Sequence, residues 1–374
     1  MRILISYEEY PIINIPRLFV GVLFIISGLI KANDTIGFSY KLGEYFEVFG
    51  MGWLTSFALI LAVSICIFEI ILGVMLLIGS RIKFTTWSLL LMIVFFTFLT
   101  FFSAYFNKVT DCGCFGDALK LTPWQSFYKD VVLLFFILII FKNQNKLQAY
   151  FTKKAENTIN IFVLILCICF VWHTYSHLPS KDFRPYAIGE NILEGMLIPE
   201  DAPQDVFEDI WYYEINGETK QFTTEQKPWK IEGAKYVDRK RKLIEKGYEP
   251  PIHDFSISKD EVDITDSILS AKKTYLVIAY NIKKSDEDAS KNLSDLFLAC
   301  EKKGITFVAL SASADELIDE FRHENHIMFP YHFTDATTLK TIIRSNPGLV
   351  KIEEGTITGK WHFNDFPSIK NLTN

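Results

Sequence analysis

Residues 53–78 read WLTSFALILAVSICIFEIILGVMLLI, and this stretch decides what kind of protein the chain is. Glu69 is its only charged residue. A bilayer has a hydrocarbon layer ~30 Å thick and an α-helix rises ~1.5 Å per residue, so ~20 consecutive apolar residues can span it. The apolar residues surround the whole helix instead of forming one stripe, which argues against a half-buried surface helix. The stretch therefore predicts a membrane-spanning helix.

Four further stretches have the same character and bring the expected number of spans to five. They are residues 16–30, 85–106, 124–141 and 159–175. No segment resembles a cleaved signal peptide, so the first span is expected to stay in the mature protein. Lys and Arg are slightly more frequent on the side of the N-terminus, which predicts a cytoplasmic N-terminus. After five crossings the C-terminal half would then be extracytoplasmic.

The composition divides the chain into two unlike halves. The 374 residues have a mean hydropathy of +0.19 and include 33 Phe. Residues 1–178 hold 13 Lys and Arg and 10 Asp and Glu, whereas the remainder holds 25 and 34. An apolar, faintly basic half is therefore followed by a polar, acidic one. This division excludes a plain cytosolic enzyme, a nucleic-acid binder, a disulfide-stapled miniprotein and a disordered chain.

Cys112 and Cys114 flank Gly113 in the connection between the third and fourth spans. Two thiols one residue apart can close only a small ring, and strained disulfides exchange readily. On an oxidising face of the membrane, this loop is a candidate thiol–disulfide exchange centre. Two other interpretations stay open. One is an inert disulfide or thiol pair, and the other is a metal site completed by His173 and His177, which have i,i+4 spacing.

Arg17, Lys31, Glu69 and Asp130 lie within the predicted spans or at their ends. An ionisable side chain in hydrocarbon costs about 2.5 kcal/mol or more, so we expect these four residues to form a buried polar network. In one interpretation Glu69 is a structural partner of Arg17 or pins the helix by a hydrogen bond. In the other, Glu69 takes part in proton transfer or in a quinone site. A membrane quinone is therefore the candidate cofactor, and no metal is assigned.

The same residues together resemble the DoxX/MauE group of four-helix membrane proteins over residues 12–142. The matching positions are Arg17, Gly21, Ser27, Gly28, Lys31, Glu69, Gly73, Leu76, Gly79, Cys112, Gly113, Cys114, Phe115, Gly116 and Asp130. The Cys-Gly-Cys-Phe-Gly loop resembles the MauE branch, whose members are implicated in maturing disulfide-rich periplasmic proteins. The resemblance implies membrane-linked thiol redox chemistry through Cys112 and Cys114, without identifying the electron acceptor.

The polar half contains strands. Asn216-Gly217 separates two strand-like stretches, 211–215 and 219–224, a pattern typical of a hairpin with a type I′ turn. From residue 254 onward strands and helices alternate, which predicts an α/β layer fold. The expected strands are residues 274–280, 305–311, 327–333, 349–353 and 357–363, and the expected helices are residues 288–303, 315–325 and 336–344.

This order of elements, with Asn346-Pro347-Gly348 ahead of the fourth strand, resembles the TlpA-like branch of the thioredoxin fold. The resemblance implies that Pro347 is the proline that is often cis beside the active site. The Cys-x-x-Cys of that branch is missing, because residues 281–286 read NIKKSD. Without a nucleophilic sulfur there, the domain cannot carry out dithiol chemistry, and we expect it to be a docking module.

We therefore expect a multi-domain protein at a bacterial inner membrane. A helical membrane bundle, with a four-helix core and a fifth span, precedes a small β region and an α/β thioredoxin-like domain. The expected boundaries are 1–146 for the four-span domain, 147–178 for a cytoplasmic loop and the fifth span, 179–250 for the β region and linker, and 251–374 for the thioredoxin-like domain.

The predicted function is thiol–disulfide exchange with extracytoplasmic client proteins through Cys112 and Cys114. The inactive thioredoxin-like domain would recruit the client or another partner, and the chain would contact the lipid bilayer but no nucleic acid. The alternative is a non-enzymatic membrane scaffold or a subunit of an envelope protein complex, an interpretation favoured by the missing Cys-x-x-Cys.

Overall fold

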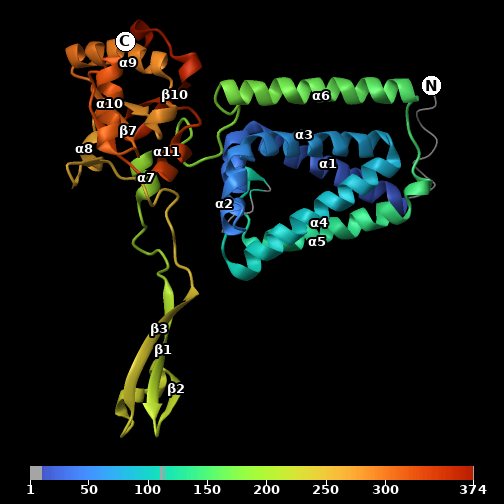
Figure 1. Ribbon diagram of the computed structural model, residues 1–374, viewed down its shortest axis with the longest axis horizontal. Coiled ribbons are helices and arrows are strands. Elements are labelled where there is room, and N and C mark those ends of the chain that lie inside the picture. The colour runs from blue at the N-terminus through green and yellow to red at the C-terminus, as the bar shows by residue number, and fades with distance from the viewer. Residues whose placement is uncertain (1–10, 110–112, 114, 374) are drawn as a thin grey trace.

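A computed structural model describes residues 11–109, 113 and 115–373. Within these described residues, the membrane half contains five helices that are long and apolar enough to cross a bilayer. They are α1 (Pro11–Asn33), α3 (Ala58–Ile78), α4 (Ile82–Phe106), α5 (Pro123–Lys142) and α6 (Lys153–Ser176), which run side by side in Figure 1. Their outer faces expose large apolar side chains, as lipid-facing helices do. The five predicted spans are confirmed, and the protein is an integral membrane protein.

Helices α1 and α3 pack so closely that their glycines have no room for side chains. A Cβ atom on Gly73 would lie 2.7 Å from the carbonyl oxygen of Gly21, and one on Gly28 would lie 3.1 Å from that of Cys66. Small residues at such a crossing let two backbones approach, which is a usual basis of helix association in lipid. This close pair brings one face of α1 directly onto the polar centre of α3.

A short helix that the sequence did not predict, α2 (Thr35–Val48), connects α1 to α3. It crosses the end of the bundle at a steep angle to the spans (Figure 1). Its N-cap is Asp34, whose Oδ1 accepts a 2.8 Å hydrogen bond from the backbone N–H of Gly37. We refer to this end of the bundle as the α2 side, and the C-terminal domain lies on it.

The C-terminal domain is built on a seven-stranded sheet with the order β10-β9-β6-β7-β8-β4-β5. The strands are β4 (Ser258–Lys259), β5 (Val262–Asp263), β6 (Thr274–Ile278), β7 (Thr306–Ser311), β8 (Tyr331–Phe333), β9 (Gly348–Glu353) and β10 (Thr356–His362). Strand β6 pairs in parallel with β7 and antiparallel with β9, and all of its side chains are buried. The five predicted strands and the α/β layer are confirmed, except that the strand predicted at residues 327–333 begins only at Tyr331, and the two-residue strands β4 and β5 were not predicted.

Helices cover both faces of this sheet. They are α7 (Ile192–Met196), α8 (Thr265–Leu269), α9 (Glu287–Lys303), α10 (Asp315–Asn325), α11 (Ala336–Ile342) and α12 (Ile369–Thr373). One apolar cluster joins the sheet to α7, α8 and α11, and a second joins it to α9, α10 and α12. Helix α9 ends at Gly304 with φ = 65°, a conformation that suits glycine. The Asn346–Pro347 peptide is cis, as the thioredoxin-like resemblance implied.

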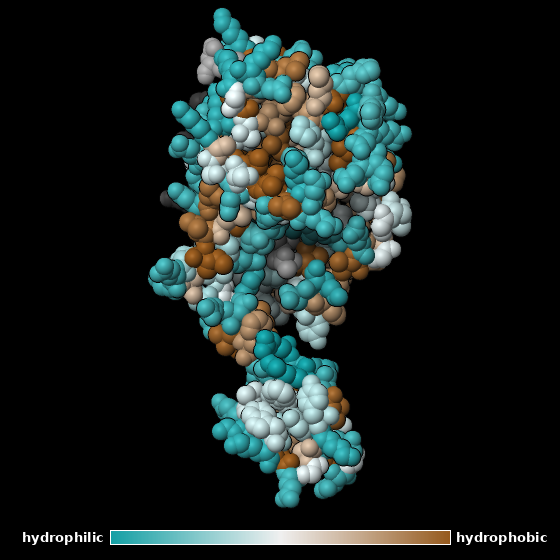
Figure 2. Space-filling view, turned by 90° about the vertical axis from the view of Figure 1, so that its left-hand side faces the viewer, coloured by the Kyte–Doolittle hydropathy of each residue, from teal (hydrophilic) through white to brown (hydrophobic). Residues whose placement is uncertain are grey.

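Between α7 and the C-terminal sheet, the chain forms an arm of three antiparallel strands, in the order β2-β1-β3. The strands are β1 (Val206–Ile215), β2 (Glu218–Thr223) and β3 (Lys235–Glu245). The hairpin between β1 and β2 is as predicted, with positive φ at both Asn216 and Gly217. Strand β3, fully exposed, was not predicted. Figure 2 shows the arm as a separate lobe below the main body.

Candidate functional site

A buried ion pair lies inside the bundle, between α1 and α3. Lys31 Nζ is 2.6 Å from Glu69 Oε2, and the two side chains are only 2% and 4% exposed. Lys31 also donates a 3.0 Å hydrogen bond to the hydroxyl of Ser27, and Ser27 donates a 3.5 Å bond to Glu69 Oε1. The i,i+4 spacing of Ser27 and Lys31 brings both polar groups to one face of α1. The cost of burying the Glu69 carboxylate is thus offset by a cation and a hydroxyl.

A second charged pair faces the first from α5. Asp130 accepts from Lys129, its neighbour in sequence, and Oδ2 of Asp130 accepts a 3.1 Å hydrogen bond from the hydroxyl of Thr100 on α4. The Asp130 side chain is 1% exposed. The two pairs line one small pocket together with Leu23, Phe24, Ser27, Ile93, Phe96 and Leu133. We call it the charged pocket.

The charged pocket is balanced in charge and small. Two lysines face two carboxylates, which makes their burial in a membrane bundle tolerable. The cavity among them measures about 20 Å³, enough for about one water molecule.

Arg17 lies away from the charged pocket. Its guanidinium donates to the carbonyl oxygens of Leu76 (2.8 Å), Leu77 (3.1 Å) and Gln148 (3.4 Å), and it stacks on the ring of Tyr150. It thereby satisfies the carbonyl groups that end α3. Of the four predicted network residues, the structure brings Lys31, Glu69 and Asp130 together and places Arg17 at the other end of the bundle. The carboxylate of Glu69 pairs with Lys31 instead of Arg17.

Cys112 and Cys114 lie outside the described residues, but their neighbours locate the loop. A Cβ atom on Gly113 would lie 3.4 Å from Cγ of Lys41 and 3.7 Å from the ring of Phe38, both on α2. Gly113 has φ = 66° and Gly116 has φ = 49°, so both use the backbone freedom expected of them. Next to the loop, the ammonium of Lys129 lies 5.4 Å from the ring centre of Phe115.

The same loop reaches the C-terminal domain at Asp117. Oδ2 of Asp117 is 3.8 Å from an Nη2 atom of Arg344, which also binds Asp34 at the start of α2. The described part of the loop is therefore enclosed by α2, the charged pocket and the C-terminal domain. Ser27, Lys129, Thr100, Asp34 and Arg344 were not assigned to a site from the sequence. Two of these residues could have been found from the sequence. Ser27 lies four residues before Lys31, on the same face of the helix, and Lys129 directly precedes Asp130.

The other described cysteines are free. Cys300 is fully buried behind the sheet, and burial raises the pKa of its thiol to about 11. Cys66 is also fully buried, whereas Cys169 is exposed on α6. Thiols with a raised pKa are poor nucleophiles at neutral pH, so Cys300 does not replace the missing Cys-x-x-Cys.

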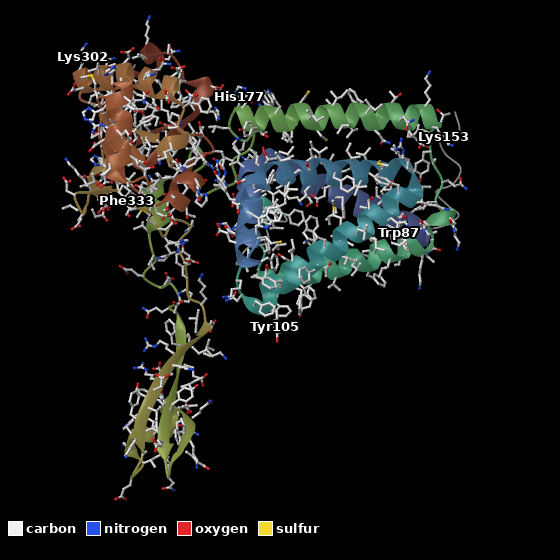
Figure 3. The ribbon with its side chains drawn as sticks, in the orientation of Figure 1. Trp87, Tyr105, Lys153, His177, Lys302 and Phe333 are labelled. Atoms are coloured by element: carbon white, nitrogen blue, oxygen red, sulfur yellow. The ribbon has the colours of Figure 1, made fainter. Side chains whose placement is uncertain are left out.

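His173 and His177 stack at the end of α6, with their ring centres 4.8 Å apart. Figure 3 labels His177 where α6 meets the C-terminal domain. Nδ1 of His177 is 2.7 Å from Oδ1 of Asp365 in that domain. Among the described residues, no group of three or more potential metal ligands comes together.

The position of the missing Cys-x-x-Cys is filled by a single turn of 3₁₀ helix, Ile282–Lys284. The side-chain amide of Asn346 donates a 2.8 Å hydrogen bond to the carbonyl oxygen of Asn281, which ties this turn to the cis-proline loop. The turn and the cis-proline loop are therefore in contact, and residues 281–286 contain asparagine and lysine but no cysteine. We call this the vestigial site.

Four spans around a charged pocket, a fifth span and a C-terminal domain with a vestigial site define an integral membrane protein with a fused thioredoxin-like module. Residues 10–142, which contain helices α1 to α5, match the family described as methylamine utilisation protein MauE. The chain is also 25% identical over 165 residues to Protein TlpB of Flavobacterium psychrophilum. That match covers 43% of this chain and 41% of TlpB, so the chain spans less than half of that relative. No solved structure matches.

Proposed function

We propose that this protein is a membrane thiol–disulfide oxidoreductase whose Cys112 and Cys114 exchange disulfides with extracytoplasmic client proteins. The observation that carries the proposal is the enclosure of the loop. Its described residues Gly113, Phe115 and Asp117 contact α2, Lys129 and Arg344 in turn. The described part of the loop lies at the α2 side of the bundle and contacts the C-terminal domain through Asp117 and Arg344. The match of residues 10–142 to the MauE family supports the same function.

Charge near the loop favours the reactive form of a thiol. Lys129 lies beside Phe115, the residue that follows Cys114. Cations next to a cysteine stabilise its thiolate, which is the nucleophile in disulfide exchange. The negative charge of Asp130 keeps the ammonium of Lys129 in place. The ammonium of Lys129, as one half of its ion pair with Asp130, is therefore held beside Phe115 at the base of the loop.

The exchange itself balances between the loop and a client. One client thiolate attacks a sulfur of a Cys112–Cys114 disulfide, the S–S bond of the loop breaks, and a mixed disulfide forms. The second client thiolate then displaces the loop cysteine. The client has gained a disulfide, and the loop has gained the two electrons and the two protons as a dithiol. The same steps in reverse reduce a client.

Trapping of the mixed disulfide tests this function. In Cys112→Ser or Cys114→Ser, the remaining loop cysteine can form a mixed disulfide with a client, but the second loop thiol that would cleave this bond is missing. A client adduct should therefore accumulate, and it should disappear on reduction. The adducts are detected on non-reducing gels of membranes and identified by mass spectrometry. Cys169→Ser is the matched control, because Cys169 is an exposed cysteine on α6. The absence of any adduct in both variants, with client oxidation unchanged, would refute the proposal.

A membrane scaffold is the second candidate, and the vestigial site favours it. Residues 281–286 contain no cysteine where a thioredoxin-like domain would carry its dithiol, so this domain binds without redox chemistry of its own. A stable complex with another envelope protein that survives loss of both loop cysteines would support the scaffold. Loss of the complex in Cys112→Ser/Cys114→Ser would instead support the redox function.

A further inference from the structure

The C-terminal domain rests on the membrane bundle through the rim of its vestigial site. Arg344, two residues before Asn346, forms the centre of this contact. Its Nε is 3.0 Å from both carboxylate oxygens of Asp34, and its Nη2 is 2.9 Å from Oδ2 of Asp34 and 3.8 Å from Oδ2 of Asp117. Its Nη1 donates to the carbonyl oxygen of Lys340. The Arg344 side chain is only 7% exposed, so water does not replace these partners.

Aromatic and apolar contacts surround this ion pair. The ring of Tyr40 on α2 lies 5.0 Å from the ammonium of Lys340 and 5.5 Å from the guanidinium of Arg344. Burial and a hydrogen bond with Tyr280, at the end of β6, raise the pKa of Tyr40 well above its usual range. Gly37 is also part of the fit, since a Cβ atom there would lie 2.6 Å from Nη2 of Arg344. The two surfaces are therefore shaped for each other.

We propose that the docking partner of the thioredoxin-like domain is its own membrane bundle, and that Arg344 is the positioning residue that holds residues 115–118 against α2 through Asp117 and Asp34. Arginine suits this role because its planar fork can bind two carboxylates at once, which a lysine ammonium does not reproduce. The rim of the vestigial site is covered while the domain is docked. A client would then meet the loop beside the domain instead of on this rim. This proposal rests on the proposed function only for the chemistry of the loop.

Asp34 has two roles that substitution can separate. It caps α2, and it binds Arg344. Burial raises the pKa of its carboxyl, but the charge of Arg344 and the nearby charge of Arg184 outweigh this effect, so the pKa lies below its usual value. Asp34→Asn removes the charge and keeps the cap, because asparagine caps helices about as well as aspartate. Asp34→Ala removes both.

Amide hydrogen exchange of the full chain in nanodiscs tests the docking without any thiol chemistry. The reporters are the N–H groups of Gly116 and Ala118, which donate to Gly113 and Phe115. In Arg344→Ala and in Asp34→Asn, we expect exchange at residues 115–118 to rise about tenfold or more, because a buried charge loses its partner. Arg322→Ala is the matched control, since Arg322 forms an exposed ion pair with Asp319 in the same domain.

The outcomes separate the two proposals. Unchanged exchange at residues 115–118 in Asp34→Asn would overturn the role of Arg344, even if Arg344→Ala perturbs the whole domain. Arg344→Lys should fail to restore protection, whereas a residue acting by charge alone would be rescued by it. If Asp34→Asn increases amide hydrogen exchange at residues 115–118 but leaves the amount of client adduct unchanged, the docking proposal is supported. An influence of docking on the chemistry of the loop is then refuted. If the single-cysteine variants form no client adduct, the proposed function fails, but the amide hydrogen-exchange test of the docking is not affected.

Discussion

Removal of one partner of the Lys31–Glu69 ion pair should strongly destabilise the bundle. The two groups are 2.6 Å apart and almost fully buried, so water neither screens the pair nor hydrates a partner left alone. Breaking such a pair from one side costs about 3–5 kcal/mol. We therefore expect Glu69→Gln and Lys31→Met each to lower the free energy of unfolding by this amount. Unfolding of the purified protein in detergent, followed by tryptophan fluorescence, measures the change.

The double substitution decides whether the pair itself is responsible. Removing both charges leaves no uncompensated ion, so Lys31→Met/Glu69→Gln should cost much less than the sum of the two single variants. A coupling energy of about 2 kcal/mol or more is expected from this cycle. Glu44→Gln is the control, because Glu44 pairs with Lys41 on the surface and should cost less than about 1 kcal/mol. Small, additive effects of both single variants would refute the reasoning.

Two further predictions concern helix packing and pH. Gly73→Ala should destabilise the bundle by about 1–3 kcal/mol, because its methyl group would lie 2.7 Å from the Gly21 carbonyl oxygen, whereas Gly52→Ala, with no atom within 4 Å, should be near neutral in the same unfolding assay. In the C-terminal domain, burial and then the charge of Arg184 lower the pKa of Lys360 to about 7 from 10.5, although Asp182 opposes them. The unfolded chain therefore binds more protons between these pH values, so stability should rise from about pH 7 to 10.5 and stay level below. Scanning calorimetry should find this rise reduced in Lys360→Met, and an identical pH profile for both proteins would contradict it.

The sequence predicted the elements of the fold that have a local signature. Long apolar runs defined the spans, and the alternation of strands and helices defined the C-terminal sheet. Helix α2 was missed because its residues mix polar and apolar types without a long apolar run. Strand β3 was missed because residues 239–242 are all basic and no apolar alternation marks them. Both elements obtain their structure from neighbours that are distant in the sequence.

The candidate site was predicted in part for a similar reason. Glu69, Lys31 and Asp130 stood out because a charge in an apolar run needs an explanation. Their partners could not be chosen from the sequence, and Arg17 was an equally reasonable partner of Glu69 until the helices were assembled. The Arg344–Asp34 contact joins residues 310 positions apart, and the sequence around each residue contains no motif that predicts the contact. Pairings of this kind are decided by tertiary structure alone.

The arm formed by β1, β2 and β3 changes how the molecule occupies a membrane. It extends past the edge of the bundle, nearly at right angles to the spans (Figure 1). The footprint of the protein is therefore larger beyond the lipid than within it. Neighbouring proteins could approach the helices closely only from directions that the arm does not cross. The lateral spacing of copies in a crowded membrane would thus be set by a β-sheet outside the bilayer, not by the helices inside it.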